Sequence, residues 1–140
     1  MHVLIVYQSR QGHTRQAAEA IGQAVRDQGH TVKLKSVIEI QKADIEQADV
    51  LFVGTWIQGF ILFGVKPAEA RLWVPALPPL TNKLIGIFCT YAFNPRSSLQ
   101  QLATLLTGQG AKIVGQMAFH RTKPGEGAAA FVQNVLQAVR

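Results

Sequence analysis

The sequence predicts an α/β fold in which five parallel strands form one sheet with helices on both faces. Apolar runs of strand length alternate along the chain with longer segments in which apolar residues recur at helical spacing. Two of these runs, Val50–Gly54 and Leu84–Thr90, are continuous, as in strands that are buried on both faces. Because parallel neighbours are joined by crossover connections, strands that alternate with helices indicate a parallel sheet.

The first half of the chain starts with a strand and an amphipathic helix. Val3–Tyr7 is an apolar strand, and the helix His13–Gln28 has its apolar residues on one face and ends at Gly29. Thr31–Val37 alternates apolar residues with lysines, which is typical of a strand at the edge of a sheet. A short helix is expected at Lys42–Gln47, before the central strand.

The second half begins with a long loop and then becomes regular again. We expect this loop at Thr55–Gly64 and a helix at Lys66–Trp73. Pro75 is then expected to interrupt the regular structure. The elements that follow are the strand Leu84–Thr90, a helix at Arg96–Gln109, the strand Lys112–Phe119 and a helix at Ala128–Val139. No repeat, linker or low-complexity segment interrupts this order, so residues 1–140 are predicted to form a single domain.

Composition and charge narrow the class of protein. With 48% hydrophobic residues the chain can bury a core, and its apolar runs are too short to span a membrane. The single cysteine, Cys89, excludes an internal disulfide and is expected to be a small buried residue in a cytoplasmic protein. Of the formal net charge of +6, +5 comes from residues 83–140, which contain six lysines and arginines and one acidic residue, Glu126. These cations are scattered without interleaved aromatic residues, which disfavours a nucleic-acid partner. They form either an ordinary solvated surface or a mildly basic face that suits an acidic partner protein.

Three segments follow the carboxyl ends of predicted strands, where ligands bind in parallel sheets. They are Gln8–Thr14, Thr55–Gly64 and Thr90–Pro95. The first leads from a buried strand into a helix and offers the hydroxyls of Ser9 and Thr14 together with amide groups at the helix start, a combination that binds phosphate. His120 is expected at the same edge, but no spacing of residues indicates a metal site or a nucleophile–base pair.

Several classes of phosphate-binding protein are excluded because the residues that they require are missing. The chain has no G-x-x-x-x-G-K-[ST] sequence and no G-x-G-x-x-G after its first strand. Where a phosphoacceptor domain needs acidic residues, the sequence has Tyr7-Gln8 and Gly54-Thr55. A cysteine phosphatase needs an arginine six positions after its cysteine, but Pro95 stands there.

The first loop carries the pattern Ile5-Val6-Tyr7-x-Ser9-x-x-Gly12-x-Thr14-x-x-x-Ala18-x-x-Ile21. This pattern resembles the amino-terminal signature of the flavodoxin family. The resemblance extends along the chain, because Gly54-Thr55-Trp56 with Gly59, and Thr90-Tyr91-Ala92-Phe93-Asn94, stand where that family keeps its two flavin loops. It implies a flavodoxin-like, doubly wound sheet of five parallel strands in the order 2-1-3-4-5.

The resemblance to flavodoxins also implies that the ligand is FMN. The phosphate of FMN is then expected at Ser9, Arg10, Gln11, Gly12, His13 and Thr14. The flavin ring is expected at Thr55, Trp56, Ile57, Gln58, Gly59, Thr90, Tyr91, Phe93 and Asn94. Arg10 either pairs with the phosphate or points to solvent, and the Gln58–Gly59 peptide is expected to turn over when the flavin is reduced.

These observations favour an FMN-binding, flavodoxin-like electron carrier rather than an enzyme. We expect it in the cytoplasm, as a monomer or a weak dimer, with an acidic, ferredoxin-like redox partner and without a membrane span or a nucleic-acid partner. Two alternatives remain open. One is an FMN-dependent NAD(P)H:quinone-type reductase, and the other is a flavin-free binding module on the same fold.

Overall fold

The computed structural model describes residues 1–10, 12–58, 66–67, 70–95 and 97–139. Its sheet has the order β2-β1-β3-β5-β6 with all of these neighbours parallel, which confirms the predicted order of five parallel strands. The bounds are His2–Tyr7 for β1, Thr31–Ser36 for β2, Val50–Gln58 for β3, Leu84–Tyr91 for β5 and Lys112–His120 for β6. A two-residue strand, β4 (Lys66–Pro67), pairs antiparallel with the end of β3.

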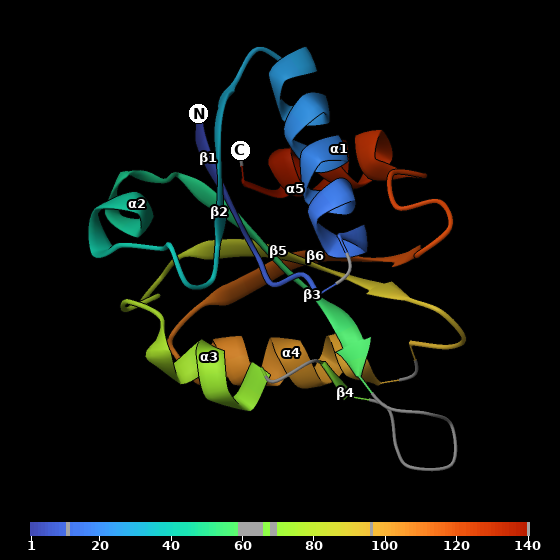
Figure 1. Ribbon diagram of the computed structural model, residues 1–140. Coiled ribbons are helices and arrows are strands. Elements are labelled where there is room, and N and C mark those ends of the chain that lie inside the picture. Colours follow the sequence, from blue (N-terminus) through green and yellow to red (C-terminus); the bar gives the residue numbers. More distant parts are fainter. Residues whose placement is uncertain (11, 59–65, 68–69, 96, 140) are drawn as a thin grey trace.

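Helices cover both faces of this sheet (Figure 1). One face carries α1 (His13–Asp27) and α5 (Ala128–Val139), and the other carries α2 (Lys42–Gln47), α3 (Ala70–Ala76) and α4 (Ser98–Thr107). Side chains along β1 alternate between the two layers, so that Val3 and Ile5 pack under α1 and α5 while Leu4 and Val6 pack against the other helices. Burial on both faces explains why this strand is apolar from Val3 to Val6.

The prediction for the chain after the central strand is wrong at one point. β3 continues through Gln58, so the predicted loop at Thr55–Gly64 begins as a strand. β5 also extends one residue beyond its prediction, to Tyr91, and Trp56 lies in register with Thr90. Because the neighbouring strand continues, the backbone of β3 keeps hydrogen-bond partners beyond the point where its apolar run ends.

The helix predicted at Lys66–Trp73 begins later than expected. Lys66 and Pro67 belong to β4, and α3 begins at Ala70. The residue before a proline is disfavoured in the helical conformation, which explains why Lys66 is extended. Pro75 does not stop the helix but lies inside it, one residue before its end.

The other elements end within two residues of their predicted bounds. Gly29 follows α1 with a φ of 84°, the left-handed conformation in which helices commonly end. α4 begins at Ser98 rather than at residue 96, and β6 extends to His120. Within the described ranges, no helix is long and apolar enough to cross a membrane.

Candidate functional site

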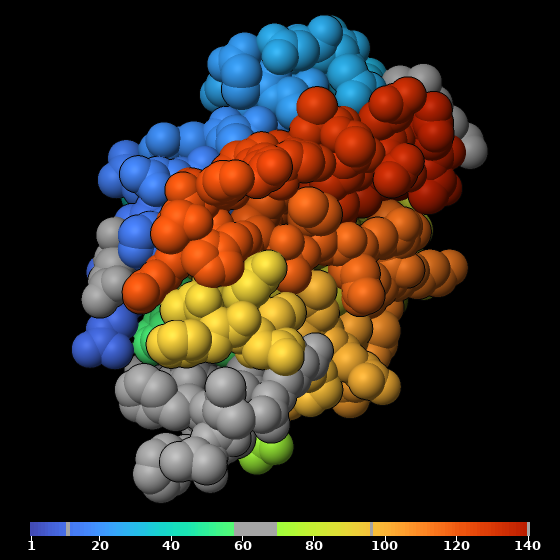
Figure 2. Space-filling model, turned by 90° about the vertical axis from the view of Figure 1, so that its right-hand side faces the viewer, coloured from blue at the N-terminus to red at the C-terminus, as the bar shows by residue number. Residues whose placement is uncertain are grey.

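The carboxyl ends of the parallel strands meet at one edge of the sheet, and Figure 2 shows the molecule from that side. Blue atoms from the start of α1, yellow atoms from the end of β5 and orange atoms from the segment after β6 lie side by side on this face. The edge therefore brings together segments that are far apart in the sequence, including two of the three predicted ligand segments.

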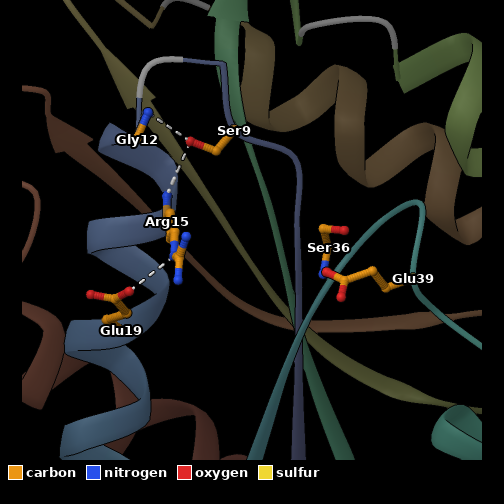
Figure 3. A network of polar contacts seen from close by, with 6 residues as sticks. All are labelled: Ser9, Gly12, Arg15, Glu19, Ser36 and Glu39. Atoms are coloured by element: carbon orange, nitrogen blue, oxygen red, sulfur yellow. Dashed lines mark hydrogen bonds and ion pairs between the residues drawn. The ribbon is translucent and has the colours of Figure 1, made fainter.

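The loop after β1 is held by the hydroxyl group of Ser9 (Figure 3). Ser9 Oγ accepts hydrogen bonds from the amides of Gly12, at 3.0 Å, and Arg15, at 3.4 Å. Gly12 has a φ of 91°, which glycine adopts at little cost. Among the described residues, its chain neighbours apart, none has an atom within 4 Å of the place where a Cβ would stand. The positive φ of Gly12, and not a lack of space for a side chain, therefore favours glycine before α1.

The start of α1 has the electrostatic character of an anion site. The first amide groups of a helix have no partner within the helix, and the helix dipole adds partial positive charge there. The first turn of α1 contains no acidic residue. Two carboxylates in this region are bonded elsewhere, since Glu19 pairs with Arg15 at 3.1 Å and Glu39 accepts from the Ser36 amide at 3.2 Å (Figure 3).

Arg10 makes a contact that the sequence did not predict. Its guanidinium carbon lies 5.5 Å from the centroid of the Trp56 ring. Arg10 is exposed and Trp56 is half-buried, and cation–π contacts at exposed positions contribute about 0.5–1 kcal/mol. The contact joins the first loop to the end of β3, so two of the predicted ligand segments touch through these side chains.

A buried hydrogen bond joins the first loop to the end of β5. The hydroxyl groups of Thr14 and Thr90 are 2.8 Å apart, and the two residues are 1% and 3% exposed. Thr14 is the second residue of α1, and Thr90 is the next-to-last residue of β5. The sequence assigned these residues to separate loops, and the sheet places their hydroxyl groups in contact.

His120 holds the segment that follows β5 and is the site residue that sequence reasoning left without a role. Its Nδ1 accepts from the Thr122 amide at 3.3 Å, so the proton is on Nε2, which donates to the Ala92 carbonyl oxygen at 2.9 Å. The ring of His120 also lies edge-on to Tyr91, with centroids 5.2 Å apart. The one sequence signal was its place at the end of the last strand, and its partners come from a distant part of the chain.

The other residues predicted near the flavin ring lie at the same edge but differ in exposure. Thr55 is buried, and its hydroxyl donates to the carbonyl oxygen of Trp56 at 3.4 Å. Ile57 is half-buried, whereas Phe93 is 71% exposed and Asn94 is exposed. The ends of β3 and β5 thus present both buried and solvent-facing side chains at this edge.

Part of the predicted site lies outside the described residues. This part consists of Gln11 and Gly59. The Gln58–Gly59 peptide, which was predicted to turn over, therefore also lies outside the described residues, although Gln58 is the last residue of β3. In the part of the chain that the structure describes, no group of histidine, cysteine or acidic side chains could hold a metal ion.

Solved structures provide a comparison for the whole fold. The two-electron reduced flavodoxin of Megasphaera elsdenii is 21% identical, with a TM-score of 0.76 over 98% of this chain and 97% of that one. The oxidised Flavodoxin 2 of Bacillus cereus is 18% identical, with the same TM-score over 98% and 99% of the two chains. The rubredoxin oxygen:oxidoreductase of Desulfovibrio gigas is 23% identical, with a TM-score of 0.74 over 99% of this chain and 36% of that one. At these identities the likeness shows the fold.

The family is shown by the sequence itself. No curated protein matches the chain. The model of the flavodoxin domain, however, matches residues 4–118, which include the first loop and the ends of β3 and β5. The chain therefore belongs to the flavodoxin family, whose members are electron-transfer proteins that generally bind FMN.

Proposed function

We propose that this protein binds FMN at the carboxyl edge of its sheet and carries electrons between redox partners. The observation that carries the proposal is the first loop, in which a turn with Gly12 at positive φ leads into a helix start without acidic residues. Arg10 of the same loop lies over the ring of Trp56. FMN supplies the redox chemistry when it is bound, while the residues of the chain bind the cofactor, orient it and limit its contact with water.

The donor set of the first loop fits a phosphate dianion. Ser9 Oγ already accepts from the amides of Gly12 and Arg15, so this turn aims backbone donors at a common acceptor position. A phosphate oxygen is a stronger acceptor than a neutral hydroxyl, and charge-assisted hydrogen bonds are about twice as strong as neutral ones. The residues proposed to hold the phosphate are Ser9, Arg10, Gln11, Gly12, His13 and Thr14.

Aromatic side chains at the ends of β3 and β5 suit a flat ring. Trp56 and Tyr91 are both half-buried, so each keeps part of its surface available to a ligand. An aromatic stack contributes about 0.5–1.5 kcal/mol beyond the area that it buries. The residues proposed to surround the ring are Thr55, Trp56, Ile57, Gln58, Gly59, Thr90, Tyr91, Phe93 and Asn94.

Titration of the apoprotein with FMN tests the proposal, and the two glycines that flank α1 provide a matched pair of variants. Gly12 and Gly29 flank the same helix, and both have positive φ. At neither position would a Cβ lie within 4 Å of an atom of the described residues, chain neighbours apart. Gly12→Glu adds a carboxylate at the phosphate site, whereas Gly29→Glu adds the same charge and backbone strain at the other end. We expect quenching of flavin fluorescence on binding, a dissociation constant raised at least about tenfold by Gly12→Glu, and little change with Gly29→Glu.

A second variant tests the ring contact. Trp56→Ala removes the aromatic face and is expected to raise the dissociation constant of FMN by about three- to tenfold. Absence of FMN binding by the wild-type protein would contradict the proposal and favour a flavin-free binding module. Equal effects of Gly12→Glu and Gly29→Glu would show that phosphate is not held at the start of α1.

The exposed charges at this edge support an acidic redox partner. We call Arg10, Phe93, Arg121 and Lys123 the docking face, since all four are exposed and lie on the loops around the proposed flavin site. Lys123 is 3.8 Å from Glu126, but both side chains are about 70% exposed, so this pair screens the face weakly. An apolar centre with a charged rim is typical of protein interfaces, and the positive rim complements an acidic, ferredoxin-like protein.

A further inference from the structure

We propose that Thr90 is a positioning residue that makes the site selective for phosphorylated flavin. The proposal rests on the proposed binding of FMN. The resemblance to flavodoxins placed Thr90 in a loop around the flavin ring, but its hydroxyl lies 2.8 Å from that of Thr14, at the start of α1. The structure thus assigns Thr90 to the phosphate end of the ligand.

The placement of Thr90 follows from the alternation of side chains along β5. Phe88 packs in the cluster under α1 and α5, and residues two apart on a strand point to the same face, so Thr90 points toward α1. Tyr91 points to the opposite face, where its ring contacts His120. At the end of β5, Thr90 therefore points toward the first loop, which is proposed to hold the phosphate, and Tyr91 points away from it.

The chemistry of a pair of hydroxyl groups gives Thr90 its role. A hydroxyl carries one proton and two lone pairs, so within the pair one group donates and the other accepts. Thr14 can direct its own proton to a phosphate oxygen if it accepts the proton of Thr90. Thr90 thereby sets the direction in which Thr14 donates, and a donor that is itself hydrogen-bonded is polarised further.

Burial makes this arrangement effective. Thr14 and Thr90 are 1% and 3% exposed, so bulk water has little access to either side chain. If one of two hydroxyl groups that bond to each other in such a position is removed, the remaining hydroxyl is left without its hydrogen-bond partner. Removal of the Thr90 hydroxyl is therefore expected to free Thr14 to rotate or to donate elsewhere, which weakens its hydrogen bond to the phosphate.

Riboflavin provides the test, because it has the ring and the ribityl chain of FMN but no phosphate. Dissociation constants for FMN and riboflavin are measured by fluorescence quenching with the wild type, Thr90→Val and Thr90→Ser. We expect Thr90→Val to raise the constant for FMN about tenfold and to change that for riboflavin less than about twofold. Thr90→Ser keeps the hydroxyl and is expected to restore the preference for FMN.

A double-mutant cycle separates positioning from simple damage. If Thr90 acts through Thr14, then Thr14→Val combined with Thr90→Val should weaken FMN binding no more than Thr14→Val alone. Thr104→Val, which removes a hydroxyl that donates to the Gln100 carbonyl in α4, is the control and should change neither constant. Thermal unfolding of each apoprotein reports whether a variant is folded.

The outcomes distinguish this inference from the proposed function. A wild-type protein that binds neither flavin contradicts the proposed function. A wild-type protein that binds both flavins equally, or a Thr90→Val variant that weakens both equally or neither, leaves the FMN site standing and overturns the role of Thr90. Selective loss of FMN affinity, restored by Thr90→Ser and not additive with Thr14→Val, supports it.

Discussion

At the scale of single residues, burial decides the chemistry of Cys89. This residue is 1% exposed near the carboxyl end of β5, which confirms the prediction that it is a small buried residue. Loss of hydration disfavours the charged thiolate and raises the pKa of the thiol to about 12. Because the thiolate is the nucleophile, the buried thiol of Cys89 is expected to react slowly in the folded protein.

The raised pKa of Cys89 predicts a loss of stability in alkaline solution. The unfolded chain releases the thiol proton near the ordinary pKa of 9.0, whereas the native protein keeps it up to about 12. Unfolding therefore releases a proton in this interval, and the free energy of unfolding falls by up to about 1.4 kcal/mol per pH unit. Urea unfolding of the wild type and Cys89→Ala between pH 7 and 11 should show a stability difference that narrows as the pH rises. A difference that is independent of pH would contradict the shifted pKa.

At the scale of elements, the ends of the strands are held together by side chains from their neighbours. β5 ends beside β6, whose last residue is His120. The His120 ring forms a hydrogen bond with the carbonyl oxygen of Ala92, in the segment after β5. The backbone supports the same contact, since the Arg121 amide donates to the Tyr91 carbonyl oxygen at 2.8 Å. Tyr91, which is proposed to face the flavin ring, therefore sits on a segment fixed by two hydrogen bonds from β6 and the residue after it.

The variant His120→Leu tests this support. It removes the hydrogen bond to Ala92, and we expect it to raise the dissociation constant of FMN about three- to tenfold because the Tyr91 segment is less well held. His2→Leu is the matched control, because His2 Nδ1 lies 2.7 Å from the Thr31 hydroxyl, just as His120 Nδ1 lies 2.7 Å from that of Thr122. Visible circular dichroism of the bound flavin reports the geometry around the ring. Equal effects of the two variants on FMN binding would argue against a specific role of His120.

At the scale of the whole molecule, the position of the charges matters more than their sum. The formal net charge is +6, but some of the positive charge is offset locally, since Lys33 and Lys35 share Asp44 at 3.3 and 3.5 Å. Lys123 on the docking face and Lys112 at the opposite end of β6 are both exposed. Variants of these two lysines separate the effect of the net charge on the rate of electron exchange from the effect of where the charge lies on the surface.

Charge reversal at these two lysines tests the acidic partner. Lys123→Glu and Lys112→Glu each change the net charge by −2, from +6 to +4. We expect electron exchange with an acidic ferredoxin to slow severalfold at low salt for Lys123→Glu and to change little for Lys112→Glu, and the wild-type rate to fall as salt rises. Stopped-flow absorbance over a series of salt concentrations measures these rates. A wild-type rate that is flat or increases with salt would contradict the acidic partner.

Much of the fold follows from short-range patterns. The apolar run of β1, the face of α1 and the glycine after it identify elements from residues that are neighbours in the sequence, because strand and helix periods are local properties. Where the prediction of β3 is wrong, pairing with other strands is the cause: β3 runs beside β5 as far as Trp56, and its last two residues pair with β4. That α3 does not begin at Lys66 was predictable from Pro67, whose effect on the residue before it is also local.

One part of the candidate site is recognisable from the sequence, and another part depends on the tertiary structure. The first loop, with Ser9, Gly12 and Thr14, is recognisable from its sequence, since a strand, a turn and a helix start in succession need no other part of the chain to define an anion site. The contacts of Arg10 with Trp56, Thr14 with Thr90, and His120 with Ala92 could not be read from the sequence. Each joins residues from segments far apart in the chain, and such pairs meet because the parallel sheet brings the carboxyl ends of its strands to one edge.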